Sequence, residues 1–301
     1  MWFAIVSTFL ILIILFVCLQ IAFSIVLPKT RNLEMTRELE LKKDETLFDF
    51  YDNYLTKEKN IKSRYGYNLT LYYFLNPESK KFIVIAHGHT YTHHGGLKYA
   101  RMMADYGYNV VLYDQRYHGK SGGKNSTLGY YEKNDLYDII SKVYLEFGDD
   151  IILGTYGESM GAATVLLEQA LDKRVVFCIS DCSFFSLNRL IKEQLKSRKV
   201  PRVFYPAINW FVKIITGVKL EEVSPIESLA NSVIPILFIH GKQDKLINYQ
   251  HSVDMYNSYQ GKKELFIASN NATHAYSFFS DNEEYKMTVK RFVEENVNEE
   301  V

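Results

Sequence analysis

The chain has 301 residues, of which 47% are hydrophobic and 23% charged, and its formal net charge is zero. This length is enough for one large core or two smaller ones, and the composition is that of a folded globular protein rather than a disordered one. A neutral chain lacks the basic excess that nucleic-acid binding usually requires, so we expect no nucleic-acid partner.

The three cysteines are too few and too scattered for a disulfide framework. One lies in the apolar N-terminus, as Cys18, and the others are Cys178 and Cys182, beside a predicted strand. We expect three free thiols. A bridge between Cys178 and Cys182, or a reactive thiol, is the alternative.

The segment from Trp2 to Leu27 has no charged residue and consists mainly of isoleucine, leucine, valine and phenylalanine. As a helix it would measure about 39 Å, more than the bilayer core of about 30 Å. We therefore predict a transmembrane anchor over residues 1–28. A cleaved signal peptide is the alternative, but the segment lacks a basic beginning, and only Ala22 and Ser24 resemble a cleavage site.

Basic residues follow this segment but none precedes it; they include Lys29, Arg31, Arg37, Lys42 and Lys43. The positive-inside rule then predicts a single-pass membrane protein whose body is cytoplasmic. Residues 29–63 are charged with spaced apolar positions, which indicates a juxtamembrane segment of one or two helices packing onto the body. A chain cut after Pro28 is expected to be soluble and active.

From residue 64 to residue 301 the chain alternates between short apolar runs and longer segments of helical character. The predicted strands are residues 69–75, 82–86, 109–113, 151–156, 175–179, 235–239 and 265–268. The predicted crossover helices include residues 98–106, 135–147 and 160–170. Short, continuously apolar runs are typical of parallel strands buried on both faces. The pattern predicts a mostly parallel, doubly wound α/β sheet.

The stretch from about 184 to 232 lacks a convincing strand but is rich in aromatic and aliphatic residues. A structureless loop of that length would be unusual, so we predict a helical insertion over one end of the sheet. Such a small cap would supply an apolar wall to a substrate pocket. The alternative is that it serves packing alone.

The most informative motif is Gly157-Glu158-Ser159-Met160-Gly161, between a predicted strand and a predicted helix. A serine on so tight a turn needs small neighbours, which Gly157 and Gly161 provide. The motif matches GxSxG, the nucleophile elbow, although an ordinary glycine-rich turn can match it by chance. The backbone amide of Met160 lies at the start of the helix, where it could donate to an oxyanion.

A serine nucleophile requires a base, and the base requires an orienting group. Asp244 follows the predicted strand 235–239, and His274 follows the next strand, so both are expected in the crevice at the carboxyl ends of the strands. Singly, Asp244 could be a turn or helix-capping residue and His274 merely exposed. Together with Ser159, in the order Ser, Asp, His, they predict a catalytic triad. Asp181 is the alternative acid.

Four histidines, His87, His89, His93 and His94, follow the predicted strand 82–86. Gly88 would let this loop approach the elbow, so that the backbone amide of His89 becomes the second oxyanion donor beside Met160. A metal site is the alternative, but no pattern of carboxylates or cysteines completes it. His93 and His94 could instead line the pocket.

From about residue 65 to residue 293 the chain resembles an α/β-hydrolase of the serine hydrolase kind. The resemblance lies in His87-Gly88-His89, Asp114-Gln115-Arg116-Tyr117-His118-Gly119-Lys120-Ser121, the elbow, Gly241 with Asp244, and His274. The Asp114 segment is similar to the family's DxRGxGxS, with Tyr117 where glycine is common, and the resemblance implies that it braces a loop near the site. It also implies Ser159 as nucleophile, His274 as base and acid, and Asp244 as orienting carboxylate. The short cap and anchor look most like membrane-attached members of the "abhydrolase domain-containing" type.

These residues lead to the hypothesis of a membrane-anchored serine hydrolase acting on an ester or thioester of a small or lipid-like acyl substrate, with no cofactor and no metal. Fold alone does not fix the substrate. An acyltransferase or peptidase would use the same triad. A hydrolase-like body that only binds a ligand is the non-enzymatic alternative, and a broken triad would be its mark. The oligomeric state is not predicted.

Overall fold

The computed structural model describes residues 1–230, 232–269 and 271–297. Within these residues a single mixed sheet has eight strands in the order β1-β2-β4-β3-β5-β6-β7-β8. β1 and β2 pair antiparallel to their neighbours, and the remaining pairs are parallel. The strands are β1 Lys57–Lys62, β2 Asn68–Phe74, β3 Lys81–Ala86, β4 Asn109–Tyr113, β5 Ile152–Glu158, β6 Val175–Asp181, β7 Ile236–Gly241 and β8 Lys263–Ala268.

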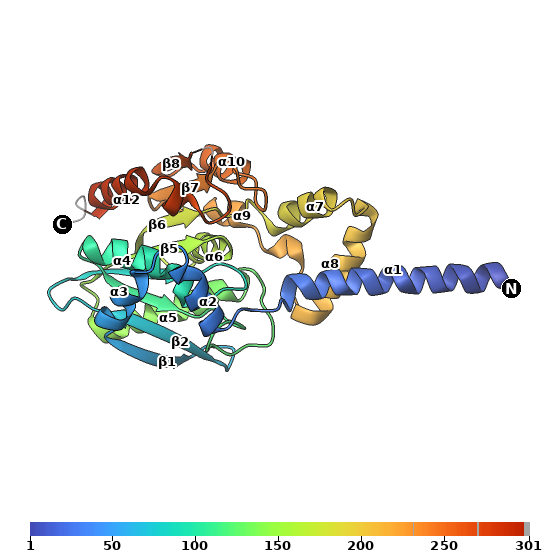
Figure 1. The fold of residues 1–301 in the computed structure, drawn as a ribbon, viewed down its shortest axis with the longest axis horizontal. Coiled ribbons are helices and arrows are strands. Elements are labelled where there is room, and N and C mark those ends of the chain that lie inside the picture. The colour runs from blue at the N-terminus through green and yellow to red at the C-terminus, as the bar shows by residue number, and fades with distance from the viewer. Residues whose placement is uncertain (231, 270, 298–301) are drawn as a thin grey trace.

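The helices cover both faces of the sheet, except for α1 and the cap, which project from one end of it (Figure 1). The helices before the cap are α1 Trp2–Val26, α2 Leu33–Leu41, α3 Leu47–Tyr54, α4 Leu97–Asp105, α5 Glu132–Phe147 and α6 Met160–Glu168. The others are α7 Leu187–Ser197, α8 Tyr205–Thr216, α9 Pro225–Leu229, α10 Gln250–Ser258, α11 Ser277–Ser280 and α12 Asn282–Val297.

Two cores form because alternate residues of each central strand point to opposite faces. In β3, Ile83 and Ile85 belong to the core that α3, α4 and α12 cover. Phe82 and Val84 belong to the opposite core, beneath α5, α6 and α10. A strand buried on both faces needs apolar residues at every position, which explains the continuous apolar runs of the sequence. The predicted mostly parallel, doubly wound sheet is confirmed.

The sheet begins earlier in the chain than expected. The segment 29–63 contains α2 and α3, which pack on the body, but also β1, which pairs antiparallel with β2 at the edge of the sheet. β1 reads Lys-Glu-Lys-Asn-Ile-Lys, with every second residue exposed. Charged side chains of this kind protect an edge strand from pairing with other chains, and they remove the apolar signal by which a strand is recognised.

The region from 184 to 232 is helical in its described part, as predicted, and forms a cap beside the sheet. It contains α7, α8, α9 and two short 3₁₀ segments, Arg202–Phe204 and Leu220–Glu222. Its apolar residues form a third core, which also contains Met160 of the elbow and the last turns of α1.

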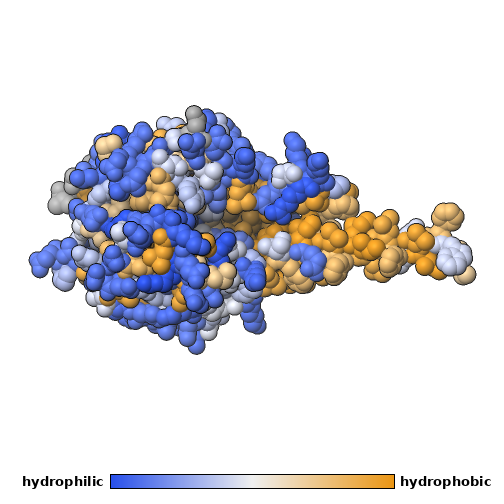
Figure 2. Space-filling view, in the orientation of Figure 1, coloured by the Kyte–Doolittle hydropathy of each residue, from blue (hydrophilic) through white to orange (hydrophobic). Residues whose placement is uncertain are grey.

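α1 is long and apolar enough to cross a membrane, a test that a signal sequence also passes. It projects from the body beside α8, and apolar surface extends along it in Figure 2. Its first half is exposed, whereas Cys18, Ala22, Ile25 and Val26 are buried in the third core. The last turns of the apolar helix are therefore part of the folded body.

Candidate active site

Ser159 lies on the sharp turn between β5 and α6. Its backbone φ of 57° and ψ of −116° are strained for a residue with a side chain, as expected for a nucleophile elbow. A Cβ atom added to Gly157 would lie 2.2 Å from the Gly161 carbonyl oxygen, and one added to Gly161 would lie 2.0 Å from that of Ala86. Neither position tolerates a side chain, so the two glycines make this turn possible.

Ser159, His274 and Asp244 form one chain of hydrogen bonds. The Oγ atom of Ser159 lies 2.9 Å from Nε2 of His274, and Nδ1 of His274 lies 2.6 Å from Oδ2 of Asp244. Asp244 follows β7 and His274 follows β8, so the three side chains meet at the carboxyl ends of the parallel strands. This is the geometry of a nucleophile, its base and the group that orients the base.

The charges of the pair favour an ionised Asp244. Burial alone would raise the pKa of this carboxyl group, but hydrogen bonds from His240 and His274 hold it well below its usual value. Burial would likewise lower the pKa of His274, but the hydrogen bond and negative charge of Asp244 raise it above 6.5. An ionised Asp244 accepts from Nδ1–H of His274, which leaves Nε2 free to accept the Ser159 proton.

His240 is a second partner of Asp244 that the sequence did not reveal. Its Nε2 atom lies 3.1 Å from Oδ2 of Asp244 and 2.8 Å from the Ile247 carbonyl oxygen, and its Nδ1 lies 2.8 Å from Ser252 Oγ. Because both groups near Nε2 are acceptors, Nε2 carries the proton and Nδ1 accepts from Ser252. The side chain is fully buried at the end of β7. Its position directly before Gly241 in His-Gly-x-x-Asp was the only signal available.

Asp181, the alternative acid, has different partners. Its Oδ2 atom accepts from the Tyr285 hydroxyl at 2.8 Å and from the Tyr99 hydroxyl at 3.2 Å. Burial, together with the nearby charge of Glu158, raises the pKa of Asp181 to about 6. Its backbone carbonyl accepts from the Ser159 amide at 2.8 Å. Asp181 therefore supports the elbow from below, and Asp244 is the acid that contacts His274.

A cavity of about 200 Å³ opens above Ser159. His89 and Met160, the predicted oxyanion residues, line it together with Ser159. A Cβ atom on Gly88 would lie 3.6 Å from that of Ser159, which shows how closely this loop approaches the elbow. Phe184 and residues of α7 supply apolar walls from the cap. The oxyanion role of the two backbone amides stays a prediction. Both residues lie at the cavity that contains Ser159, as this role requires.

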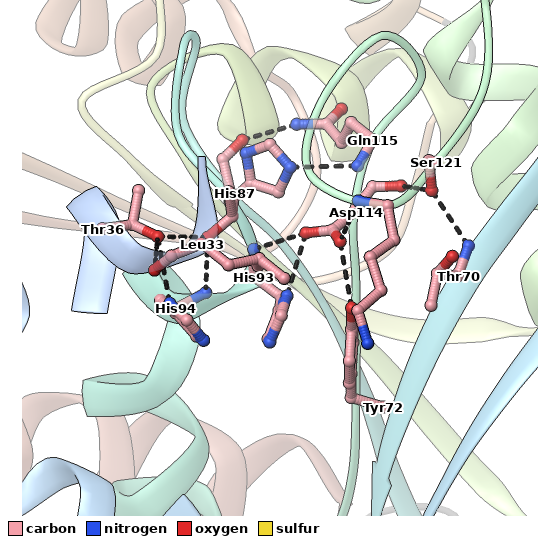
Figure 3. A network of polar contacts seen from close by, with 12 residues as sticks. Leu33, Thr36, Thr70, Tyr72, His87, His93, His94, Asp114, Gln115 and Ser121 are labelled. Atoms are coloured by element: carbon pink, nitrogen blue, oxygen red, sulfur yellow. Dashed lines mark hydrogen bonds and ion pairs between the residues drawn. The ribbon is translucent and has the colours of Figure 1, made fainter. Parts of the chain in front are cut away.

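The His87–His94 loop is held by the segment that begins at Asp114 (Figure 3). The Asp114 carboxylate accepts from the backbone amide of His93 at 2.8 Å and lies 2.9 Å from its Nδ1. The backbone amide of Gln115 donates to Nε2 of His87 at 2.9 Å. Tyr117 has a φ of 68°, a conformation that favours glycine. These contacts brace the loop near Ser159.

Three histidines of this loop, His87, His93 and His94, make contacts that hold the loop in place. Burial of His87, together with the nearby His118, lowers its pKa to about 3. Its imidazole is therefore neutral, and Nε2 accepts a hydrogen bond from the backbone amide of Gln115. His94 contacts the Thr36 hydroxyl at 3.0 Å. His93 lies beside Asp114, and His94 lies beside Thr36 of α2 (Figure 3). Neither residue lines the cavity above Ser159. The alternative role of these two residues, as lining of the pocket, is therefore wrong.

Within the described residues, the cluster of possible metal ligands consists of Cys182, Asp244 and His274, whose ligand atoms lie within 4.8 Å of one another. Two of these residues already belong to the hydrogen-bonded chain with Ser159. Burial and the charge of Asp181 raise the pKa of Cys182 well above its usual value, so it is a protonated thiol and a poor ligand. Cys18, Cys178 and Cys182 are all free and buried.

The sequence has a clear relative among known proteins. It is 33% identical over 258 residues to the uncharacterized protein YqkD of Bacillus subtilis, an alignment that covers 83% of this chain and 84% of the relative. Residues 77–211 match the family described as serine aminopeptidase, S33. The chain belongs to the α/β-hydrolase superfamily.

Solved structures of other α/β-hydrolases share its fold. The esterase Pf2001 of Pyrococcus furiosus superposes with a TM-score of 0.66 at 22% identity, over 82% of this chain and 95% of that one. Est1E of Butyrivibrio proteoclasticus superposes with a TM-score of 0.62 at 18% identity, over 81% and 100%. At such identities the likeness shows the fold alone, and it confirms the α/β-hydrolase fold predicted from the sequence.

Proposed function

We propose that the protein is a membrane-anchored serine hydrolase that cleaves a carboxylic ester or thioester through an acyl-serine intermediate. The observation that carries this proposal is the hydrogen-bonded chain from Ser159 through His274 to Asp244 at the floor of a largely apolar cavity. The aromatic and aliphatic residues above it favour an acyl group as the part of the substrate that is bound.

In this mechanism Oγ of Ser159 attacks the acyl carbonyl carbon while Nε2 of His274 takes its proton. The negative oxygen of the tetrahedral intermediate accepts hydrogen bonds from the Met160 and His89 amides. His274 then gives the proton to the leaving alcohol or thiol, and the acyl-serine remains. Water, deprotonated by His274, attacks this ester, and His274 then gives that proton to Oγ of Ser159 as the acid is released. Asp244 stabilises the imidazolium in both halves and stays ionised.

The packing of α1 favours an anchor over a cleaved signal sequence. Cleavage after Ser24 would remove Cys18 and Ala22, which are 1% and 0% exposed in the core beneath the cap. A segment built into the core is costly to lose, because each buried apolar side chain contributes to stability. The basic residues after α1 support a cytoplasmic position for the body.

Other chemistries on the same residues are alternatives. An acyltransferase would differ in the acceptor that reaches the acyl-serine. A peptidase is suggested by the printed description of the matching family, serine aminopeptidase. The largely apolar lining favours an acyl group over a peptide amine. A purely binding role is disfavoured because the hydrogen-bonded chain that activates the serine is complete.

Covalent labelling with a fluorophosphonate tests the proposal. The wild-type protein should label, and Ser159→Ala and His274→Ala should not, because the probe requires an activated serine. Ser258→Ala, at an exposed serine of α10, is the matched control and should label fully. Labelled protein should then be screened with esters, thioesters and aminoacyl amides. A folded wild type that does not label, or label that persists in Ser159→Ala, would overturn the proposal.

A further inference from the structure

The end of α1 forms part of the cavity that contains Ser159. Ile21, Ser24 and Ile25 line this cavity. Leu190, Ile191 and Leu195 of α7 line it as well. The cavity thus extends from the elbow along two helices that both project from the same end of the sheet (Figure 1). A helix that served only as a tether would have no need to contribute side chains to this cavity.

Backbone hydrogen bonds fix the end of α1 in this position. The Val26 carbonyl accepts from the Ser126 amide at 2.9 Å. A few residues later, the Arg31 amide donates to the Thr90 carbonyl at 2.9 Å, directly beside His89 of the loop near Ser159. The end of α1 is therefore held by the segment before α5, and the residues that follow α1 are held against the loop that is predicted to bind the oxyanion.

The length of the free part of α1 determines how close this cavity lies to a membrane. The stretch from Trp2 to Val17 precedes the first buried residue, Cys18, and all its residues except the half-buried Ile14 are exposed. As a helix its 16 residues measure about 24 Å, less than the bilayer core of about 30 Å. If α1 spans a bilayer, its docked turns must reach the edge of the apolar layer, and the cavity reaches that edge with them.

The cap has exposed apolar and basic side chains, as expected for a segment at the surface of a bilayer. α8 packs along α1, and its Trp210 and Ile214 are 55% and 60% exposed. Exposed tryptophan and basic side chains are typical of segments at the surface of a bilayer with anionic lipids. Between residues 192 and 219 the only acid is Glu193, whereas the basic residues are Lys192, Lys196, Arg198, Lys199, Arg202, Lys213 and Lys219.

We propose that the last turns of α1 are one wall of the acyl-binding pocket, and that the occupant is the acyl chain of an ester carried by a membrane amphiphile. The chain enters from the bilayer surface between α1 and α7, and its carbonyl carbon reaches Ser159 at the inner end. The cavity of about 200 Å³ exceeds the roughly 150 Å³ that holds benzene, so it admits an apolar group of several carbons. This inference rests on the acyl-serine chemistry proposed above.

Ester hydrolysis tests whether α1 forms a wall of the acyl pocket. The full chain is placed in phosphatidylcholine nanodiscs, and p-nitrophenyl octanoate and p-nitrophenyl acetate are the two substrates. Ile21→Trp should lower the octanoate-to-acetate ratio of kcat/KM about tenfold, the scale on which an apolar pocket discriminates methylene groups. Ile21→Ala, which adds room, should raise this ratio. Leu12→Trp, on the exposed part of the same helix, is the matched control and should leave it unchanged. Equal ratios in all four proteins would overturn the inference.

The source of the acyl chain is tested by fluorescence. The sequence contains two tryptophans, Trp2 and Trp210, so Trp2→Phe leaves Trp210 as the sole reporter on the cap. In nanodiscs of phosphatidylcholine brominated near the start of its acyl chains, Trp210 should lose most of its emission relative to unbrominated lipid. Undiminished emission would place the cap clear of the lipid and would overturn entry from the bilayer.

Failure of this inference can be told apart from failure of the proposed function. If the wild-type protein labels with fluorophosphonate and hydrolyses the acetate ester, but the Ile21 variants have the same octanoate-to-acetate ratio of kcat/KM, the proposed function stands. The proposal that α1 forms a wall of the acyl pocket is then wrong. A folded protein that neither labels nor hydrolyses either ester refutes the function, and this inference with it.

Discussion

The Nζ atom of Lys98 lies 2.6 Å from Oε2 of Glu158, the residue directly before the nucleophile, and both side chains are buried. Burial would raise the pKa of Glu158, but the positive charge of Lys98 lowers it, so the carboxyl group is ionised. Burial would in turn lower the pKa of Lys98, but Glu158 raises it. Two charges that would be costly alone are thus stable as a pair beneath the elbow.

Lys98→Met should therefore lower the free energy of unfolding by about 3–5 kcal/mol, because it leaves the buried charge of Glu158 without its cation, and among the described residues only the Tyr99 hydroxyl still donates to Oε2. The double variant Lys98→Met/Glu158→Gln should regain most of this loss, since neither charge is then unpaired. Urea denaturation in detergent measures both values. Equal losses in the single and double variants would show that Lys98 acts through packing alone.

The activity should rise with pH as His274 loses its proton, because only neutral Nε2 can accept the proton of Ser159. Asp244 raises the pKa of His274, so the midpoint of kcat/KM should lie above 6.5. Asp244→Asn should lower kcat by about 10⁴-fold, the loss seen for the matching change in a serine protease triad. Its midpoint should shift to lower pH, because the negative charge that stabilises the imidazolium is gone. An unchanged midpoint would remove Asp244 from contact with the base.

His240 should act as a positioning residue for Asp244. His240→Ala removes one of the donors that hold Oδ2, so Asp244 orients His274 less well and its own pKa rises. We expect kcat to fall about 10-fold to 100-fold, by analogy with lost supporting contacts in metal sites. The midpoint of the rise of kcat/KM with pH, which reports the loss of the His274 proton, should shift as well. His251→Ala, at a buried histidine of α10 that contacts Glu193, controls for loss of packing and should leave the profile in place.

The sequence was sufficient for the parallel part of the sheet and for the elbow because their signals are local. Every strand expected after residue 64 is present, since burial on both faces produces continuous apolar runs. Gly157 and Gly161 indicated the tight turn of the elbow correctly, because no side chain fits at either position. β1 was missed because its charged residues protect an edge and carry no apolar run.

The contacts that were missed join different elements of the fold. His240 contacts Ser252 because α10 packs against β7, and it contacts Ile247 in the loop between these two elements. Lys98, on α4, meets Glu158 across the loops that follow β3 and β5. The apolar composition of α1 makes it a candidate membrane span, and composition alone does not distinguish its exposed turns from those that line the cavity. Such pairings depend on tertiary packing rather than on local pattern.

The docking of α1 changes the expected outcome of truncation. The sequence alone predicts that a chain lacking residues 1–28 is soluble and active, but this cut removes Ile25 and Val26 from the core beneath the cap. Each buried side chain of this kind contributes about 1.5–3 kcal/mol. Removal of residues 1–16 deletes only part of the exposed helix and retains the docked turns.

We therefore expect the chain lacking residues 1–16 to leave the membrane fraction and to match the full-length protein in fluorophosphonate labelling and thermal unfolding. The chain lacking residues 1–28 should unfold at a lower temperature and aggregate, because the apolar surface of α8 that α1 covers becomes exposed. Sedimentation, labelling and a thermal melt of the two truncated proteins measure the difference. If both unfold at the same temperature, the docked turns of α1 do not stabilise the body, and the segment before residue 29 is a tether alone.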